Sequence, residues 1–167
     1  MSEQNNRNKK ITLFFLEDDR EMLEHLYDIV ECARHEMGED FVSAWSATNL
    51  ADTEYRLECD PGIAAFTHFL FDLDVGYYKT LRDSKVISYG DRTGFAGLDY
   101  ILDAHENNPL FHDMMEAGRV AVFTGHSIDF LRKTDSTEND VYRCLKGRYF
   151  TKLGKNPSDE IMKWLKG

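Results

Sequence analysis

The stretch HFLFDLDVG, residues 68–76, decides the fold of this chain. The stretch contains the end of an apolar run, residues 66–71, and the two aspartates that follow this run, Asp72 and Asp74. A short run rich in aromatic and aliphatic residues is typical of a strand buried on both faces of a parallel sheet. Burying a carboxylate is costly. Two aspartates at the tip of such a strand therefore indicate a site rather than an ordinary turn.

Four further runs of the same kind predict strands over residues 11–16, 40–46, 119–125 and 148–152. Helical patterns lie between them, over 19–38, 47–59, 94–107 and 127–134, and a last helix is expected after Asn156 and Pro157. Strands that alternate with helices predict an α/β protein. We expect a three-layer, flavodoxin-like, five-stranded parallel sheet with helices on both faces. A long insertion, about 75–93, follows the third strand and is either a loop or a small hairpin.

The composition limits the possible partners. The chain has 167 residues, the size of one domain, and a formal net charge of −10. This charge argues against nucleic-acid binding and against docking on an anionic membrane, because both need Lys and Arg. The first nine residues are polar, lack the apolar core of a signal peptide and are expected to be a disordered tail before a single domain over 10–167. Cys32, Cys59 and Cys144 form no zinc motif, which suggests reduced thiols and a cytoplasmic protein.

Polar groups gather at the carboxyl ends of the predicted strands, where open α/β sheets place their sites. They are Asp18 and Asp19, Asp72 and Asp74, Thr124, and Lys152. Carboxylates that meet in one place repel one another and need a cation, and oxygen ligands of this kind suit Mg²⁺. A lysine would offset the remaining charge, and a hydroxyl could bind an oxyanion. One carboxylate could then act as a nucleophile toward a phosphoryl group.

The ordered motifs FLEDD, LFD, VFTG and YFTK resemble the receiver domain of two-component response regulators, the CheY-like family. The resemblance extends from Ile11 to Leu165. It implies that Asp72 accepts the phosphoryl group and that Thr124 and Lys152 bind its oxygens. It also implies that Asp18 and Asp19 hold Mg²⁺ together with Asp72.

Two further roles follow from the same resemblance. Asp74 would offer its main-chain carbonyl to the metal, and Tyr149, three residues before the lysine, would be the aromatic switch. The resemblance also implies partners for a stand-alone receiver: a histidine kinase or a phosphotransfer protein as donor, and a downstream protein. A homodimer is a further alternative that the sequence leaves open. The downstream protein would bind on the face formed by the fourth helix, fifth strand and fifth helix.

The chain departs from the family pattern at several positions. Leu153 replaces the proline that normally follows the lysine, and the insertion separates DLDVG from TGFAGLDYI. DLDVG, the insertion and His126-Ser127 resemble receiver-like domains that are predicted to process cyclic phosphates. Those domains commonly carry a histidine where this chain has Leu73. The sequence therefore leaves three functions open: a phosphoacceptor, an enzyme acting on cyclic phosphates, and a pseudo-receiver that takes no phosphate.

Other interpretations of single features also remain. DLD, VAVFT and a later lysine resemble haloacid-dehalogenase-type phosphatases, but the acidic pair comes first here, an order that favours a receiver. Asp18 or Asp19 alone could simply cap the first helix. The insertion could cover the site, form a dimer edge or block access. DSTEND, residues 135–140, is expected to be a solvated loop.

Overall fold

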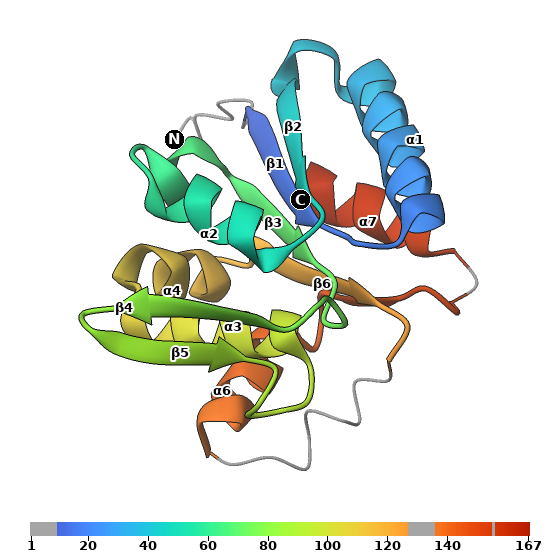
Figure 1. The fold of residues 1–167 in the computed structure, drawn as a ribbon. Helices are drawn as coiled ribbons and strands as arrows, with labels where there is room; N and C mark the ends of the chain where they lie inside the picture. Colours follow the sequence, from blue (N-terminus) through green and yellow to red (C-terminus); the bar gives the residue numbers. More distant parts are fainter. Residues whose placement is uncertain (1–9, 127–135, 155) are drawn as a thin grey trace, which may run out of the picture.

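The fold is a five-stranded parallel sheet between two layers of helices (Figure 1). The structure is a computed structural model and describes residues 10–126, 136–154 and 156–167, without the side chains of 136–139. The sheet contains β1 (Ile11–Leu16), β2 (Phe41–Ala47), β3 (His68–Phe71), β6 (Val120–Thr124) and β7 (Tyr149–Thr151). Their order is β2-β1-β3-β6-β7, and every neighbouring pair is parallel. This is the flavodoxin-like order, and the predicted fold class is confirmed.

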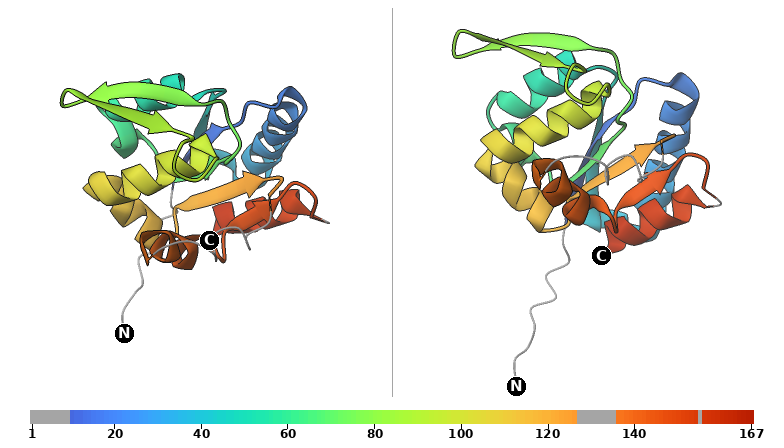
Figure 2. Two further views of the ribbon diagram at one scale, coloured as in Figure 1. Left: turned by 60° about the horizontal axis from the view of Figure 1, so that its bottom comes forward. Right: turned by 90° about the horizontal axis from the view of Figure 1, so that it is seen from below.

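Alternation of side chains along β3 divides the core into two halves. Phe69 and Phe71 face one layer, which contains α2 (Leu50–Glu58), α3 (Ala96–Asn107), α4 (Pro109–Glu116) and α6 (Ser136–Leu145). Leu70 faces the other layer, which contains α1 (Arg20–Met37) and α7 (Pro157–Lys166). Figure 2 shows the two layers from further directions. Because β3 is the middle strand of the sheet, Asp72, which follows it, lies at the centre of the carboxyl edge.

The insertion folds into an antiparallel hairpin of β4 (Tyr78–Arg82) and β5 (Lys85–Tyr89). Asp83 and Ser84 form its turn with φ values of 51° and 63°. Two successive positive φ values are typical of the tight turns whose twist matches that of a hairpin. Of the two alternatives for this segment, the hairpin is the one observed.

Two helical segments were not expected. α4 begins at Pro109, where the sequence predicted only the exit of the preceding helix; Asn108 caps it by accepting a hydrogen bond from the Phe111 amide. α6 begins at Ser136, so the loop predicted over 135–140 is wrong for its helical part. Short 3₁₀ turns over Gly38–Asp40 and Gly62–Ala65 complete the elements. The helix predicted over 127–134 and the tail over 1–9 lie outside the described residues.

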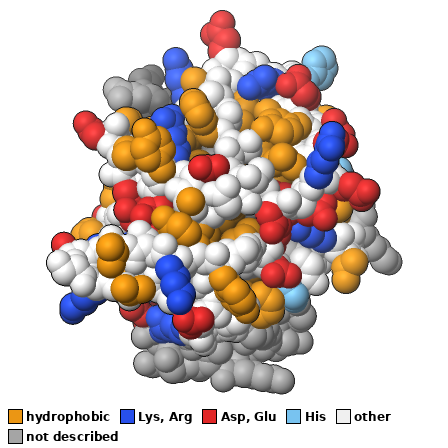
Figure 3. Space-filling view, in the orientation of Figure 1, with side chains coloured by type: hydrophobic (Ala, Val, Ile, Leu, Met, Phe, Trp, Pro, Cys, Tyr) orange, Lys and Arg blue, Asp and Glu red, His pale blue; other side chains and the backbone are white. Residues whose placement is uncertain are grey.

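In the part of the chain that the structure describes, no helix combines the length and the apolar character needed to cross a bilayer. Acidic and basic side chains are interspersed on the face seen in Figure 3.

Candidate functional site

Asp72 lies at the carboxyl end of the central strand and is buried, with 3% of its surface exposed. Its amide donates to the Leu16 carbonyl at 2.9 Å, which continues the β1–β3 pairing one residue beyond the strand. Its Oδ1 atom accepts from the Asp74 amide at 3.2 Å, and its Oδ2 atom accepts from Lys152 Nζ at 3.0 Å. The carboxylate is therefore fixed by its own loop on one side and by a lysine on the other.

Two more carboxylates come from the end of β1. One oxygen each from Glu17, Asp18 and Asp72 lies within 4.8 Å of the others. Glu17 is fully buried, and Asp18 is exposed. Asp19 lies outside this group: its Oδ1 atom accepts from the Met22 amide at 3.0 Å and caps α1.

The sequence predicted Asp18 and Asp19 as the metal-binding pair, and that role stays a prediction. The structure brings Asp18 and Asp72 together as expected, adds Glu17, and gives Asp19 to the helix. Three acidic residues follow β1 in a row, and the pattern alone does not say at which of them the strand ends. Glu17 is part of the motif FLEDD, but the sequence alone gave it no role.

Lys152 joins the two buried carboxylates. Its Nζ atom is 2.8 Å from Glu17 Oε2 and 3.0 Å from Asp72 Oδ2, and only 15% of its side chain is exposed. Burial alone would lower the pKa of Lys152, but its hydrogen bond to Glu17 and the charge of Asp72 outweigh that effect and raise it. The lysine therefore stays positively charged.

Two carboxyl groups of the site, Glu17 and Asp18, have raised pKa values. Burial is the main reason that the pKa of Glu17 rises to about 7, and the charge of Asp72 adds to this rise while Lys152 opposes it. Burial, followed by the charge of Asp72, also raises the pKa of Asp18. Negative charge is in excess at this point even with the lysine in place, which is the condition that a bound cation would relieve.

Thr124 ends the neighbouring strand, β6. Thr124 is fully buried, and its Oγ1 atom has no hydrogen-bond partner among the described residues. Its carbonyl accepts from the amide of Lys152, the residue that follows β7, at 2.8 Å, so the threonine and the lysine lie at the ends of adjacent strands. A buried hydroxyl without a partner is costly and calls for an explanation such as an external ligand.

Tyr149 and Asp74 lie at the rim and contact His126. The Tyr149 hydroxyl donates to the His126 carbonyl at 3.0 Å. The Asp74 carboxylate is mostly exposed, and its Oδ2 atom lies 3.4 Å from His126 Nε2. The His126 ring also packs on Phe95, with 4.3 Å between ring centroids. The side chain of Asp74 thus points to the rim and lies outside the group of three carboxylates.

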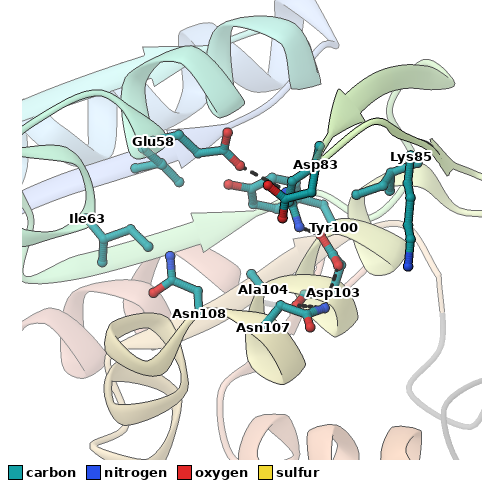
Figure 4. A pocket seen from close by; sticks show the side chains of 12 residues that line it. Glu58, Ile63, Asp83, Lys85, Tyr100, Asp103, Ala104, Asn107 and Asn108 are labelled. Atoms are coloured by element: carbon teal, nitrogen blue, oxygen red, sulfur yellow. Dashed lines mark hydrogen bonds and ion pairs between the residues drawn. The ribbon is translucent and has the colours of Figure 1, made fainter.

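Space for a small ligand lies next to the carboxylates. A pocket of about 360 Å³ is lined by Asp18, Asp74, Val75, Gly76, Tyr77 and Gly94. A larger cavity of about 660 Å³ lies away from the site, between the hairpin, α2 and α3 (Figure 4). Arg82 in that cavity donates to Asp103 at 2.9 Å and to Glu58 at 3.2 Å, so its charge holds the hairpin against the two helices.

Gly97 allows the first turn of α3 to touch the strand end. Its amide donates to the Leu73 carbonyl at 3.0 Å. A Cβ atom at this position would lie 2.9 Å from Leu73 Cα and closer still to the Asp72 carbonyl oxygen. Only glycine fits here, so the position of Asp72 depends on a residue more than 20 positions away along the chain.

No protein-family model matches the sequence, and no curated protein matches it either. Among solved structures, the chain resembles a bacteriophytochrome response regulator, AtBRR, with a TM-score of 0.52 and 13% sequence identity. The alignment covers 94% of this chain and 93% of that one. The likeness shows the fold: the chain folds like a response-regulator receiver, as the motifs indicated.

Proposed function

We propose that this chain is a receiver domain in which Asp72 accepts a phosphoryl group with the help of Mg²⁺. The observation that carries the proposal is the position of Asp72, which is buried between Lys152 and the acidic residues Glu17 and Asp18. Thr124, whose hydroxyl has no partner among the described residues, ends the adjacent strand. Nucleophile, cation ligands, fixed positive charge and free hydroxyl are the parts that phosphoryl transfer to a carboxylate needs.

The residues present fit a magnesium ion. The donor set consists of carboxylate oxygens from Glu17, Asp18 and Asp72, and Mg²⁺ prefers such ligands with water completing its shell. When bound, the ion would neutralise charge on the carboxylates and on the phosphoryl oxygens. Asp19 is better explained as the cap of α1 than as a ligand. Asp74 stays a proposed main-chain ligand.

The chain's own residues divide the remaining work. An Asp72 carboxylate oxygen attacks the phosphorus of a phosphodonor, a bond from that oxygen to phosphorus forms, and the bond to the donor's leaving group breaks. The Lys152 ammonium, which already contacts Asp72, would stabilise the negative charge on the transferred group. The Thr124 hydroxyl would donate a hydrogen bond to a phosphoryl oxygen and so gain the partner that it lacks.

Tyr149 is the proposed reporter of phosphorylation. Its hydroxyl donates to the His126 carbonyl, at the start of the segment that follows Thr124. A shift of Thr124 toward a bound phosphoryl group would change this contact and move the ring. The protein partners expected of a receiver, a histidine kinase or phosphotransfer protein and a downstream protein, are part of the same proposal.

The test is phosphorylation by a small donor. The full chain is incubated with Mg²⁺ and acetyl phosphate and its intact mass is measured. We expect one added phosphoryl group, which Asp72→Asn abolishes and which the matched control Asp74→Asn, an exposed carboxylate two residues away, retains. An adduct that survives Asp72→Asn, or no adduct with any donor, overturns the proposal. No adduct together with no Mg²⁺ or beryllofluoride binding would identify a pseudo-receiver.

One observation favours a second candidate, an enzyme that acts on cyclic phosphates. His126 and Asp74 form a pair at 3.4 Å beside the pocket near Asp18, and such a pair could move a proton to or from a phosphate ester. Turnover of 2′,3′-cyclic phosphates that is lost in His126→Ala would establish this function. If the chain is only a receiver, it should not turn over cyclic phosphates, and the variant His126→Ala should still be phosphorylated on Asp72.

A further inference from the structure

A second group of metal-ligating side chains lies away from the carboxylate site. One ligand atom each from His105, His112 and Glu116 lies within 4.8 Å of the others. His105 is in the last turn of α3, and the other two residues are on α4. Because α3 begins beside Asp72, its last turn lies toward the opposite edge of the sheet. The group therefore has no part in the proposed phosphoryl chemistry.

The local structure holds these side chains together. His112 and Glu116 are four residues apart on one helix, so they share a face of α4. The tight connection at Asn108 turns α4 back against α3, and His112 Nδ1 then lies 3.3 Å from the His105 carbonyl oxygen. The two imidazole rings are 4.3 Å apart between centroids. Side chains from two helices thus converge before any ion is bound.

One ring nitrogen of His105 is buried without a hydrogen-bond partner among the described residues. The residue is 8% exposed, and its Nε2 atom is enclosed and makes no hydrogen bond within the described part of the chain. Burial, and then the nearby His112, lower the pKa of His105. A metal ion binds the neutral form of an imidazole ring. A buried imidazole nitrogen without a partner needs explaining, and a cation would supply the partner.

Other groups surround the cluster on the side of α6. Cys144 is buried, and its Sγ atom donates to Glu116 Oε1 at 3.4 Å. Arg143 donates to the same oxygen at 3.0 Å, from an exposed position. Asp140 is near enough for its charge to act on His105. Arg143 offsets the charge of Glu116, so Asp140 leaves the surroundings of the cluster negative by about one charge.

We propose that His105, His112 and Glu116 bind a transition-metal ion of the zinc type. Cys144 lies outside the group whose ligand atoms are within 4.8 Å of one another, but its Sγ atom contacts Glu116, so rotation of its side chain would make it the fourth ligand. Imidazole and thiolate ligands exclude Mg²⁺ and favour Zn²⁺ in a tetrahedral site. At metal–ligand distances of about 2.0–2.3 Å, tetrahedral ligand atoms are about 3.3–3.8 Å apart, so side-chain rotation must close the present gaps. Coordination of Cys144 displaces the thiol proton, which leaves to solvent. The bound ion would link α3, α4 and α6.

The test is a titration of the metal-free full chain with Co²⁺ alone, followed by displacement with Zn²⁺. The exposed thiols are removed first by Cys32→Ser and Cys59→Ser, so that they cannot bind the ion. We expect one equivalent of Co²⁺, the strong visible absorption of a tetrahedral site, a near-ultraviolet thiolate band and release of a proton. Loss of a residue that only supports a metal ligand lowers metal affinity by ~10–100-fold. Because His112 is proposed to bind the ion directly, His112→Ala should lower the Co²⁺ affinity by more than this.

Two controls separate this site from other ligands. His35→Ala removes an exposed histidine on α1, and Asp72→Asn disturbs the carboxylate site; both should keep the tetrahedral spectrum. If circular dichroism shows that His112→Ala does not fold, Glu116→Gln decides, because Glu116 is on the surface. An absence of saturable binding, or an affinity unchanged in both variants, overturns the proposal. Absence of the thiolate band overturns the assignment of Cys144.

Discussion

Replacing Lys152 by methionine tests the electrostatic account of the carboxylate site. The substitution keeps most of the side chain's length but removes the charge that lies 2.8 Å from Glu17 and 3.0 Å from Asp72. Both carboxylates are at least 96% buried, so water does not replace the lost partner. Breaking a buried ion pair from one side costs about 3–5 kcal/mol. We expect a loss of this size in the free energy of unfolding, with a chelator present at about pH 8.

The loss should depend on pH in a defined direction. The pKa of Glu17 is already raised to about 7, so at lower pH this carboxyl takes up a proton and no longer needs the lysine. The destabilisation by Lys152→Met should therefore be smaller at about pH 6 than at about pH 8. At 100 times the variant's own dissociation constant, Mg²⁺ should stabilise the variant by about 2.7 kcal/mol. At the same Mg²⁺ concentration the parent should gain less, because the lysine already supplies a positive charge there.

The assay is urea unfolding followed by the fluorescence of Trp45 and Trp164. Lys166→Met is the matched control, since Lys166 pairs with Glu36 on the surface and such a pair is worth about 0–1 kcal/mol. The unfolding slope with urea should be unchanged in both variants. If Lys152→Met costs no more than Lys166→Met, or if its cost rises as the pH falls, Lys152 does not stabilise the two buried carboxylates by its charge.

Three further predictions concern other parts of the structure. The pKa of Glu17 is raised to about 7, so its protonated carboxyl stabilises the parent at low pH, and the parent loses this stability as the pH rises through about 7. Glu17→Gln cannot titrate at this position. Without metal, the free energy of unfolding of Glu17→Gln relative to the parent should therefore rise by about 3 kcal/mol from pH 4.5 to 7.5. A pH-independent difference in urea unfolding contradicts this. Gly97→Ala should cost about 1–3 kcal/mol and reduce phosphorylation, whereas Gly147→Ala, in open space, should do neither. Asp103→Asn should speed hydrogen exchange over residues 78–89, and equal exchange would show that Asp103 does not anchor the hairpin.

The sequence predicted the sheet because its signal is strong and local. Each strand is a short apolar run that ends in polar residues, and β3 is the clearest case. The same ends predicted the positions of Asp72, Thr124 and Lys152. The sequence could not predict which of Glu17, Asp18 and Asp19 face the site, because this depends on which residue is the last to pair with β2. The structure shows that Glu17 still donates to Ala47, which keeps its side chain inside.

The missed helices have different causes. α4 carried a usable signal: Asn108 followed by Pro109 is the same start that predicted α7 at Asn156 and Pro157. It was interpreted as an exit because a helix precedes it directly. α6 begins within a polar stretch whose first turn shows no apolar residue, and its buried face starts only at Val141. Tertiary packing, rather than local pattern, decides such a start.

The path of the hairpin bears on access to the proposed site. α2 begins where β2 ends, so its last residue, Glu58, lies toward the amino edge of the sheet. Arg82, at the tip of the hairpin, contacts Glu58, and Tyr89 and Arg82 both donate to Asp103 on α3. The hairpin therefore folds back along the helices and away from the carboxyl edge, as Figure 1 shows.

Only the base of the insertion approaches the carboxylates. Tyr77 lines the pocket beside Asp18, whereas β4 and β5 lie over α2 and α3. Of the roles left open for the insertion, a cover over the site is thus disfavoured by the anchoring contacts at Asp99 and Asp103. A phosphodonor would meet Asp72 at an edge that the hairpin leaves accessible. The hairpin changes the helical flank instead, so a partner that recognises this flank would have to accept two additional strands.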